Sequence, residues 1–412
     1  MSDAAAPATP RPAAVAFVLV TVVLDVLAFG IVVPVLPKLI EAFRHGDTGL
    51  AAETYGAFAT AWALMQFVFS PVLGVLSDRC GRRRVLLLSL LGLGLDYVLM
   101  ALAPNLAWLF VGRVISGITA ATYSTATAYI ADVTPVERRA ASFGYVGAAW
   151  GVGFIIGPAL GGVLGGVDPR LPFWAAAGLT LANAGYGLLV LPESLPRERR
   201  KPLAWRRANP LGALILVRSR PGLAGLFAVH VLYLLAHYSL PAVFVLYASY
   251  RYGWGAREVG LTLALFGACS ALAQGVIVGP AVRRIGERRA VLLGLGCGIA
   301  AYALYGLAPS GAWFLVAIPF GGLSGLYGAA LQALMTQRVQ PHEQGQLQGA
   351  NSSAMGLMGL IGPALFTVVF ARAIAPAAAS AWHVPGAPFL VAAALTSLAF
   401  VLALRTAVVV AR

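Results

Sequence analysis

Apolar residues run along this chain in long uninterrupted blocks instead of alternating with polar ones. Each block holds the roughly 20 residues that a helix needs to cross the hydrocarbon core of a bilayer. In lipid only a helix or a closed barrel satisfies its own backbone hydrogen bonds. The pattern therefore predicts an all-α membrane protein with twelve transmembrane helices, near residues 13–36, 54–76, 85–103, 106–130, 141–166, 171–191, 222–247, 256–281, 290–308, 311–334, 346–370 and 387–408.

The composition leaves little chain for a soluble domain. Of 412 residues, 59% are hydrophobic and only 11% are charged, against about 25% charged in ordinary soluble domains. The sequence contains no metal-spaced His/Cys cluster, nucleophile elbow or phosphate loop, and its three cysteines suggest neither a disulfide framework nor a zinc site. We therefore expect no enzyme activity, no metal and no cofactor, and the absence of these motifs argues against the alternative of a membrane enzyme or receptor.

The distribution of positive charge gives the expected orientation. The net charge is +14, but most of the Lys and Arg residues fall in alternate loops, which is the bias of cytoplasmic loops in membrane proteins. We expect both termini in the cytoplasm and no nucleic-acid partner. The first apolar block is too long for the core of a signal peptide, so we interpret it as a retained span.

A polar, Arg- and Pro-rich stretch divides the chain into two halves of six spans. We expect a cytoplasmic tail at 1–12, a first bundle at 13–191, a cytoplasmic linker at 192–221 and a second bundle at 222–408. Three segments recur at a constant offset of about 205 residues: GVLSDRCGRRR and GPAVRRIGERR, LAPNLAW and LAPSGAW, and GPAL twice. A duplicated six-helix unit of this kind is typical of secondary transporters, whose substrate sites lie near mid-membrane between the halves.

Several motifs carry a family resemblance. The loop GVLSDRCGRRR, the span 4 segment GRVISG and the span 5 segment GVGFIIGPALGG resemble signatures of the major facilitator superfamily. The segments LDVLAFGIVVPVLP, LLSLLGLGLDYVLMA, GERRAVLLG and GQLQG resemble its tetracycline/proton antiporter group. The resemblance implies a monomeric transporter of the bacterial inner membrane that uses the proton gradient. The expected function is proton-coupled efflux of a lipophilic, tetracycline-like or other drug; the alternative is proton-coupled uptake of a small nutrient.

Two carboxylates lie inside predicted spans, Asp25 in span 1 and Asp96 in span 3. Charges at this depth are costly and usually face a partner or an aqueous cavity, and a desolvated carboxyl group takes up a proton more readily. Arg113 is the only Lys or Arg at depth. We expect Asp25 to carry the proton, Asp96 to be a second carrier or cation contact, and Arg113 to tune them. The alternative is a static buried ion pair.

The second half departs from the antiporter group. Gly298 stands where that group has an acid in span 9, and no span of this half contains a mid-membrane carboxylate. His230, which lies 205 residues after Asp25, and His237 are the candidates for proton transfer there, since histidine titrates near neutrality. A hydrogen-bonded packing role is the alternative for both, and of the two we assign proton coupling to His237.

The resemblance also implies gating residues. In the family, the acidic and basic side chains of the loop after span 2 hold one conformer closed, which points to Asp78, Arg79, Arg82 and Asp132, with the start of span 11 near 345–349 as a further partner. These charges could instead serve only to set topology. Gly157 and Pro158 in span 5 let helices pack closely and bend, with influence on gating.

We expect the substrate cavity to be largely apolar with a few polar anchors. Polar side chains at depth that match the group's pattern are the candidate contacts. They are Gln66, Gln274, Gln332 and Gln348, and from the aromatic residues that could line the cavity we add Tyr238.

Overall fold

The computed structural model describes residues 12–120, 122–134, 136–196, 198, 200, 217, 222–340, 343–375 and 383–408. The predicted tail at 1–12 and most of the linker at 192–221 lie outside this part of the chain. Within it the secondary structure is helical, with no strand. Twelve candidate spans are present, as predicted: Val15–Phe43, Thr48–Cys80, Arg82–Leu102, Leu106–Val133, Gly144–Val167, Leu171–Val190, Leu223–Tyr252, Ala256–Ile285, Glu287–Leu307, Gly311–Thr336, Gln344–Ile374 and Ala387–Thr406.

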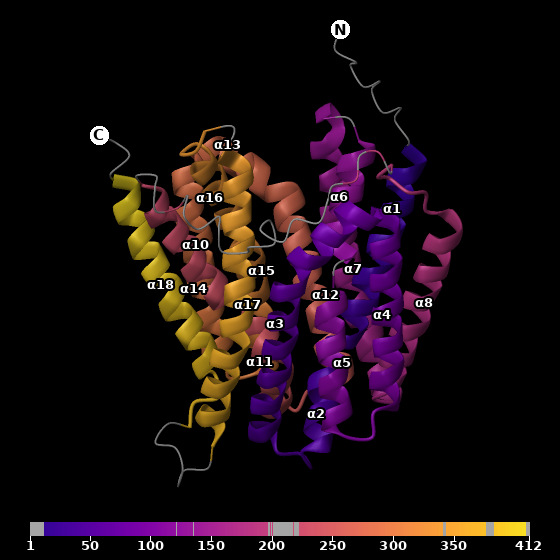
Figure 1. Cartoon of the computed structure of the whole chain (residues 1–412). Coiled ribbons are helices and arrows are strands. Elements are labelled where there is room, and N and C mark those ends of the chain that lie inside the picture. Colours follow the sequence, from indigo (N-terminus) through magenta and orange to yellow (C-terminus); the bar gives the residue numbers. More distant parts are fainter. Residues whose placement is uncertain are drawn as a thin grey trace.

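The helices form two side-by-side groups (Figure 1). The first comprises α1 (Pro12–Val32), α2 (Leu36–Phe43), α3 (Thr48–Cys80), α4 (Arg82–Leu102), α5 (Leu106–Thr119), α6 (Thr122–Val133), α7 (Val136–Val167) and α8 (Leu171–Val190). The second comprises α10 (Leu223–His237), α11 (Ser239–Tyr252), α12 (Ala256–Leu272), the π-helical η3 (Ala273–Val278), α13 (Gly279–Ile285), α14 (Glu287–Leu307), α15 (Gly311–Leu323), α16 (Leu326–Thr336), α17 (Gln344–Ile374) and α18 (Ala387–Val408).

The start of α1 and the end of α18 lie at the same end of the bundle, at the top of Figure 1. We call this end the terminal face and the other end, where α2 begins the turn into α3, the opposite face. The loop between α3 and α4 is therefore at the terminal face, together with the segment that follows α8. An even number of spans brings the start of α1 and the end of α18 to one face.

Breaks in the spans repeat at the offset seen in the sequence. The first span is interrupted after Val32, where Pro34 and Pro37 lack the backbone N–H that a continuous helix needs, and α10 gives way to α11 at Tyr238. The fourth span breaks at Ala120, and its counterpart, the tenth, breaks at 324–325. The duplication thus extends to the backbone breaks.

The two groups meet mainly along two helix pairs, α3 against α17 and α7 against α12, and α11 adds contacts with α2 and α3. Among the described residues, the hydrogen bonds between the groups lie between the opposite face and mid-bundle. Lys38 donates to Ser249, the Tyr55 hydroxyl lies 3.4 Å from the Pro241 carbonyl oxygen, and Thr60 Oγ1 lies 3.5 Å from the Leu360 oxygen. The groups are therefore joined most firmly toward the opposite face.

Within the first group, α1 and α7 approach at backbone distance. A Cβ atom added to Gly157 would lie 2.8 Å from Gly30 Cα and 2.9 Å from the Leu27 carbonyl oxygen, and one added to Gly30 would lie 2.9 Å from Pro158 Cδ. Only glycine fits at such a crossing. The predicted role of Gly157 in close packing is visible here, whereas α7 continues through Pro158 as one helix.

Candidate functional site

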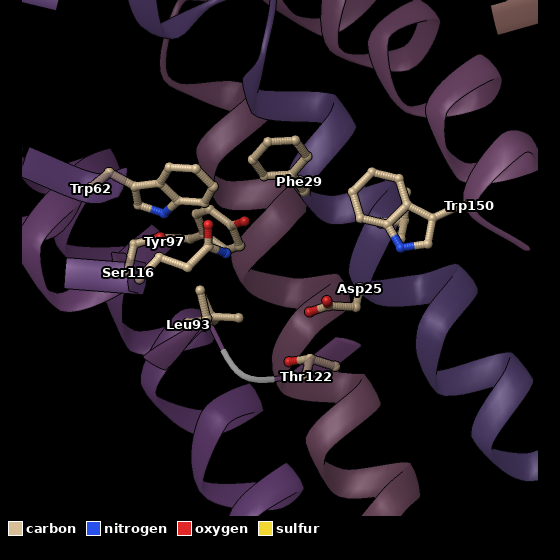
Figure 2. A pocket seen from close by; sticks show the side chains of 11 residues that line it. Asp25, Phe29, Trp62, Leu93, Tyr97, Ser116, Thr122 and Trp150 are labelled. Carbon is tan, nitrogen blue, oxygen red and sulfur yellow. The ribbon is translucent and has the colours of Figure 1, made fainter. Parts of the chain in front are cut away.

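A pocket opens inside the first group of helices around Asp25 (Figure 2). Its volume is about 560 Å³, including the open mouth. Helices α1, α3, α4, α5, α6 and α7 all contribute to its wall. The lining residues are Asp25, Val26, Phe29, Trp62, Gln66, Leu93, Tyr97, Ser116, Ala120, Thr122 and Trp150.

Asp25 presents its carboxyl group to this pocket and is only half-buried. The Thr122 hydroxyl points toward it from the first turn of α6 (Figure 2). The break between α5 and α6 at Ala120 brings that turn to mid-bundle. Four aromatic side chains, those of Phe29, Trp62, Tyr97 and Trp150, supply most of the remaining wall. The site therefore combines one ionisable group with an apolar, aromatic surface, as drug-binding cavities do.

Asp96 and Arg113 lie behind the pocket wall. Asp96 is 1% exposed and Arg113 is 8% exposed. Both carboxyl oxygens of Asp96 and the Arg113 Nε are buried without a hydrogen-bond partner among the described residues, and the two side chains do not form an ion pair. The Arg113 guanidinium instead lies over the Trp62 ring, 5.2 Å from its centre. The described residues therefore do not contain the static ion pair between Arg113 and a buried aspartate that was the alternative interpretation of the sequence.

In the second group, the positions that match Asp25 and Thr122 hold His230 and Tyr327. His230 Nδ1 and the Tyr327 hydroxyl are 2.7 Å apart. The Tyr327 ring lies 3.9 Å from that of Tyr233, whose hydroxyl is 2.7 Å from Ser324 Oγ. His237 stacks on Tyr233 at 6.3 Å with its side chain exposed. A polar cluster of histidine, tyrosine and serine occupies the place of the carboxyl site.

Gly298 borders this same cluster. A Cβ atom there would lie 3.4 Å from both Tyr233 Cε2 and Thr396 Cγ2 and 3.6 Å from Ser324 Cβ. These are ordinary van der Waals distances, so a small side chain would fit. The glycine therefore leaves an interior position without a polar group next to the tyrosines.

Of the predicted substrate contacts, only Gln66 lines the Asp25 pocket. Gln274 and Gln348 are exposed, and the Tyr238 hydroxyl donates to the Met355 carbonyl oxygen at 3.3 Å. Gln332 Oε1 accepts a 2.8 Å hydrogen bond from Asn351, which ties α16 to α17. The structure thus distributes these five residues over both groups of helices, and their role in binding stays a prediction.

The predicted gating charges meet at the terminal face. Arg82 bonds Asp78 at 2.5 Å and Asp132 at 3.1 Å, while Arg79 is exposed. The expected contact of Asp78 with the start of span 11 is not present among the described residues. Glu193, which no sequence motif pointed to, joins these charges, because its carboxylate accepts the Arg82 backbone N–H at 2.8 Å.

Several site residues lacked a recognisable sequence signal. Ser116, Thr122 and Trp150 are ordinary members of apolar spans, and nothing in the spacing of Trp62 predicts that it covers Arg113. Within the described residues, no group of three or more His, Cys, Asp or Glu residues is arranged to hold a metal ion. The Asp25 pocket places one carboxyl group beside an apolar, aromatic surface.

Comparison with known proteins identifies the family. Residues 18–363 match the Major Facilitator Superfamily. The chain belongs to this superfamily. It is 41% identical over 379 residues to the class C tetracycline resistance protein of Escherichia coli, covering 92% of this chain and 93% of the relative. It is 40% identical over 372 residues to the class G tetracycline resistance protein of Vibrio anguillarum, covering 89% and 91%.

A solved structure of the superfamily resembles the whole bundle. The crystal structure of the human organic anion transporter MFSD10 superposes with a TM-score of 0.69 at 25% identity, covering 96% of this chain and all of that chain. The transporter architecture and the multi-pass membrane placement predicted from the apolar blocks are therefore confirmed. The major facilitator superfamily consists of transporters, so its members act on a substrate by moving it.

Proposed function

We propose that this major facilitator protein exports a lipophilic drug, tetracycline or a similar molecule, in exchange for protons. The observation that carries the proposal is the Asp25 carboxyl group, which faces an aromatic pocket at membrane depth. A group in this position can take a proton from one side and release it to the other as the pocket changes access. The energy is adequate, since one charge crossing 100 mV yields about 2.3 kcal/mol. The tetracycline resistance proteins that the chain resembles support the choice of substrate.

The orientation follows from the charges. With the Arg-rich terminal face in the cytoplasm of a bacterium, the contacts between the two groups close the site toward the outside. The structure then corresponds to the state that loads drug from the cytoplasm. We propose that the protein works in the inner membrane as a monomer, with the proton gradient as its energy source and without a cofactor.

We assign the individual roles as the sequence predicts them. Asp25 carries the proton, Asp96 assists it, Arg113 tunes both, and His237 serves the second group of helices. Substrate contacts come from Gln66, Tyr238, Gln274, Gln332 and Gln348. The gate at the terminal face consists of Asp78, Arg79, Arg82 and Asp132. Gly157 and Pro158 influence gating through the close packing of α7 against α1.

Drug accumulation in cells tests the proposal. Cells expressing the protein should accumulate less tetracycline than cells without it, and a protonophore should abolish the difference. The Asp25→Asn variant should behave as if no transporter were present, because an amide cannot exchange a proton. Glu198→Gln, which changes an exposed carboxylate outside the spans, should export normally.

Two outcomes would contradict the proposal. Full export by Asp25→Asn would remove Asp25 from the coupling mechanism. Accumulation that rises with expression and collapses with the protonophore would favour proton-coupled uptake of a nutrient instead.

A further inference from the structure

Trp62 lies between the pocket and the buried arginine. Its side chain lines the pocket that contains Asp25, and the Arg113 guanidinium sits over its ring at 5.2 Å. Phe29 stacks on the same indole, with 6.2 Å between ring centres and 24° between planes. A guanidinium over an indole face is held electrostatically, and the attraction strengthens when both groups are shielded from water. The indole therefore gives the positive charge a partner that is not a carboxylate.

The backbone fixes Trp62 in this position. A Cβ atom added to Gly117 of α5 would lie only 2.6 Å from the Trp62 carbonyl oxygen and 3.2 Å from its Cα. Helices α3 and α5 are thus in direct backbone contact one turn beyond Arg113. The backbone of Trp62 is therefore closely packed, and the indole that extends from it lies under the Arg113 guanidinium.

Asp96 packs against the residue that precedes Arg113 in α5. A Cβ atom added to Gly112 would lie 2.6 Å from Asp96 Oδ1, and Asp25 of α1 lines the same pocket as Trp62. Among the described residues, Arg113 forms no ion pair with either aspartate. An opposite charge in direct contact favours the ionised form of a carboxyl group. A paired aspartate would therefore resist protonation.

We propose that Trp62 is a positioning residue that holds Arg113 away from Asp25 and Asp96, so that these carboxyl groups stay free to gain and lose a proton. The inference rests on the proposed function, because it assumes proton exchange at Asp25. It also links drug and proton, since the ring that holds Arg113 is part of the surface that the drug contacts. A substrate that packs against this wall therefore contacts Trp62, the residue that holds Arg113.

The test compares Trp62→Leu and Trp62→Met with the conservative Trp62→Phe. Loss of the aromatic face lets Arg113 turn to a carboxylate, so the pH at which drug–proton exchange is half-maximal should fall by about one unit. Trp62→Phe keeps a ring face and should retain the native profile. Trp174→Leu is the matched control, because Trp174 of α8 is 45% exposed and is not among the residues that line the pocket.

A double variant shows whether Trp62 acts through Arg113. In an Arg113→Gln background, Trp62→Leu should cause no further shift, since the charge that it releases is gone. A shift of equal size in that background would overturn the proposal, and so would a native pH profile in Trp62→Leu and Trp62→Met.

Infrared titration of the protonated carboxyl band provides a readout that needs no transport. In purified protein in lipid, loss of that band should move to lower pH in Trp62→Leu, with Asp25→Asn and Asp96→Asn used to assign the signal. An unmoved band would also overturn the positioning role. Failure of the proposed function would appear separately, as export that persists in Asp25→Asn.

Discussion

His230 Nδ1 and the Tyr327 hydroxyl lie 2.7 Å apart in the second group of helices, and each residue follows its counterpart in the Asp25 pocket by 205 positions. The counterparts, Asp25 and Thr122, also face each other. The duplicated halves thus preserve a polar pair at one place in the fold while its chemistry differs. One copy presents an acid to a pocket, and the other joins an imidazole to a phenol.

The hydrogen bond to His230 should contribute to stability. Tyr327→Phe leaves a largely buried ring nitrogen without that partner, which costs about 1–3 kcal/mol. We expect a lower unfolding temperature for the purified protein in detergent. Tyr250→Phe, at an exposed position, should leave that temperature unchanged. Equal unfolding temperatures for Tyr327→Phe and the native protein would show that the pair is dispensable.

The crossing of α1 and α7 should not tolerate a methyl group. Gly157→Ala places a Cβ atom 2.8 Å from Gly30 Cα, and overpacking of this kind costs about 1–3 kcal/mol. Gly151→Ala in the same helix meets nothing within 4 Å and serves as the control. We expect Gly157→Ala alone to reduce both thermal stability and transport rate. Similar behaviour of the two variants would contradict the close crossing.

Cross-linking should arrest the transporter at the opposite face. In a background with the three native cysteines replaced by serine, Lys38→Cys with Ser249→Cys joins α2 to α11 across the two groups. Oxidation should block drug transport, and reduction should restore it. Lys38→Cys with Glu41→Cys lies within α2 and should leave transport intact. Continued transport by the oxidised inter-group pair would mean that this face does not need to open.

The α3–α4 loop should depend on Glu193. This carboxylate accepts the Arg82 backbone N–H at 2.8 Å and lies 4.0 Å from the Arg200 guanidinium, so it caps the start of α4. Loss of a helix cap costs about 0.5–2 kcal/mol. Glu193→Ala should speed hydrogen exchange at the amides of 82 and 83, whereas Glu198→Ala should not. Unchanged exchange in Glu193→Ala would assign the cap to another group.

The sequence predicted the architecture because hydrophobic length alone identifies membrane spans. The twelve blocks, the family and the matching halves were all evident from the order of residues. The direction of each side chain was not evident from the sequence, because an apolar span has no periodic pattern that marks the face lining a cavity. The contact of Trp62 with Arg113 and the cap that Glu193 provides join residues 51 and 111 positions apart. Local pattern cannot report such contacts.

The backbone breaks of the spans recur at equivalent places in the two halves, after Val32 and at Tyr238, and again at Ala120 and at 324–325. The polar groups beside them differ, since Asp25 and Thr122 in one half correspond to His230 and Tyr327 in the other. The course of the backbone therefore does not depend on which polar pair stands beside the break. Substitutions at these interior positions can change the chemistry of the site while the helices keep their course.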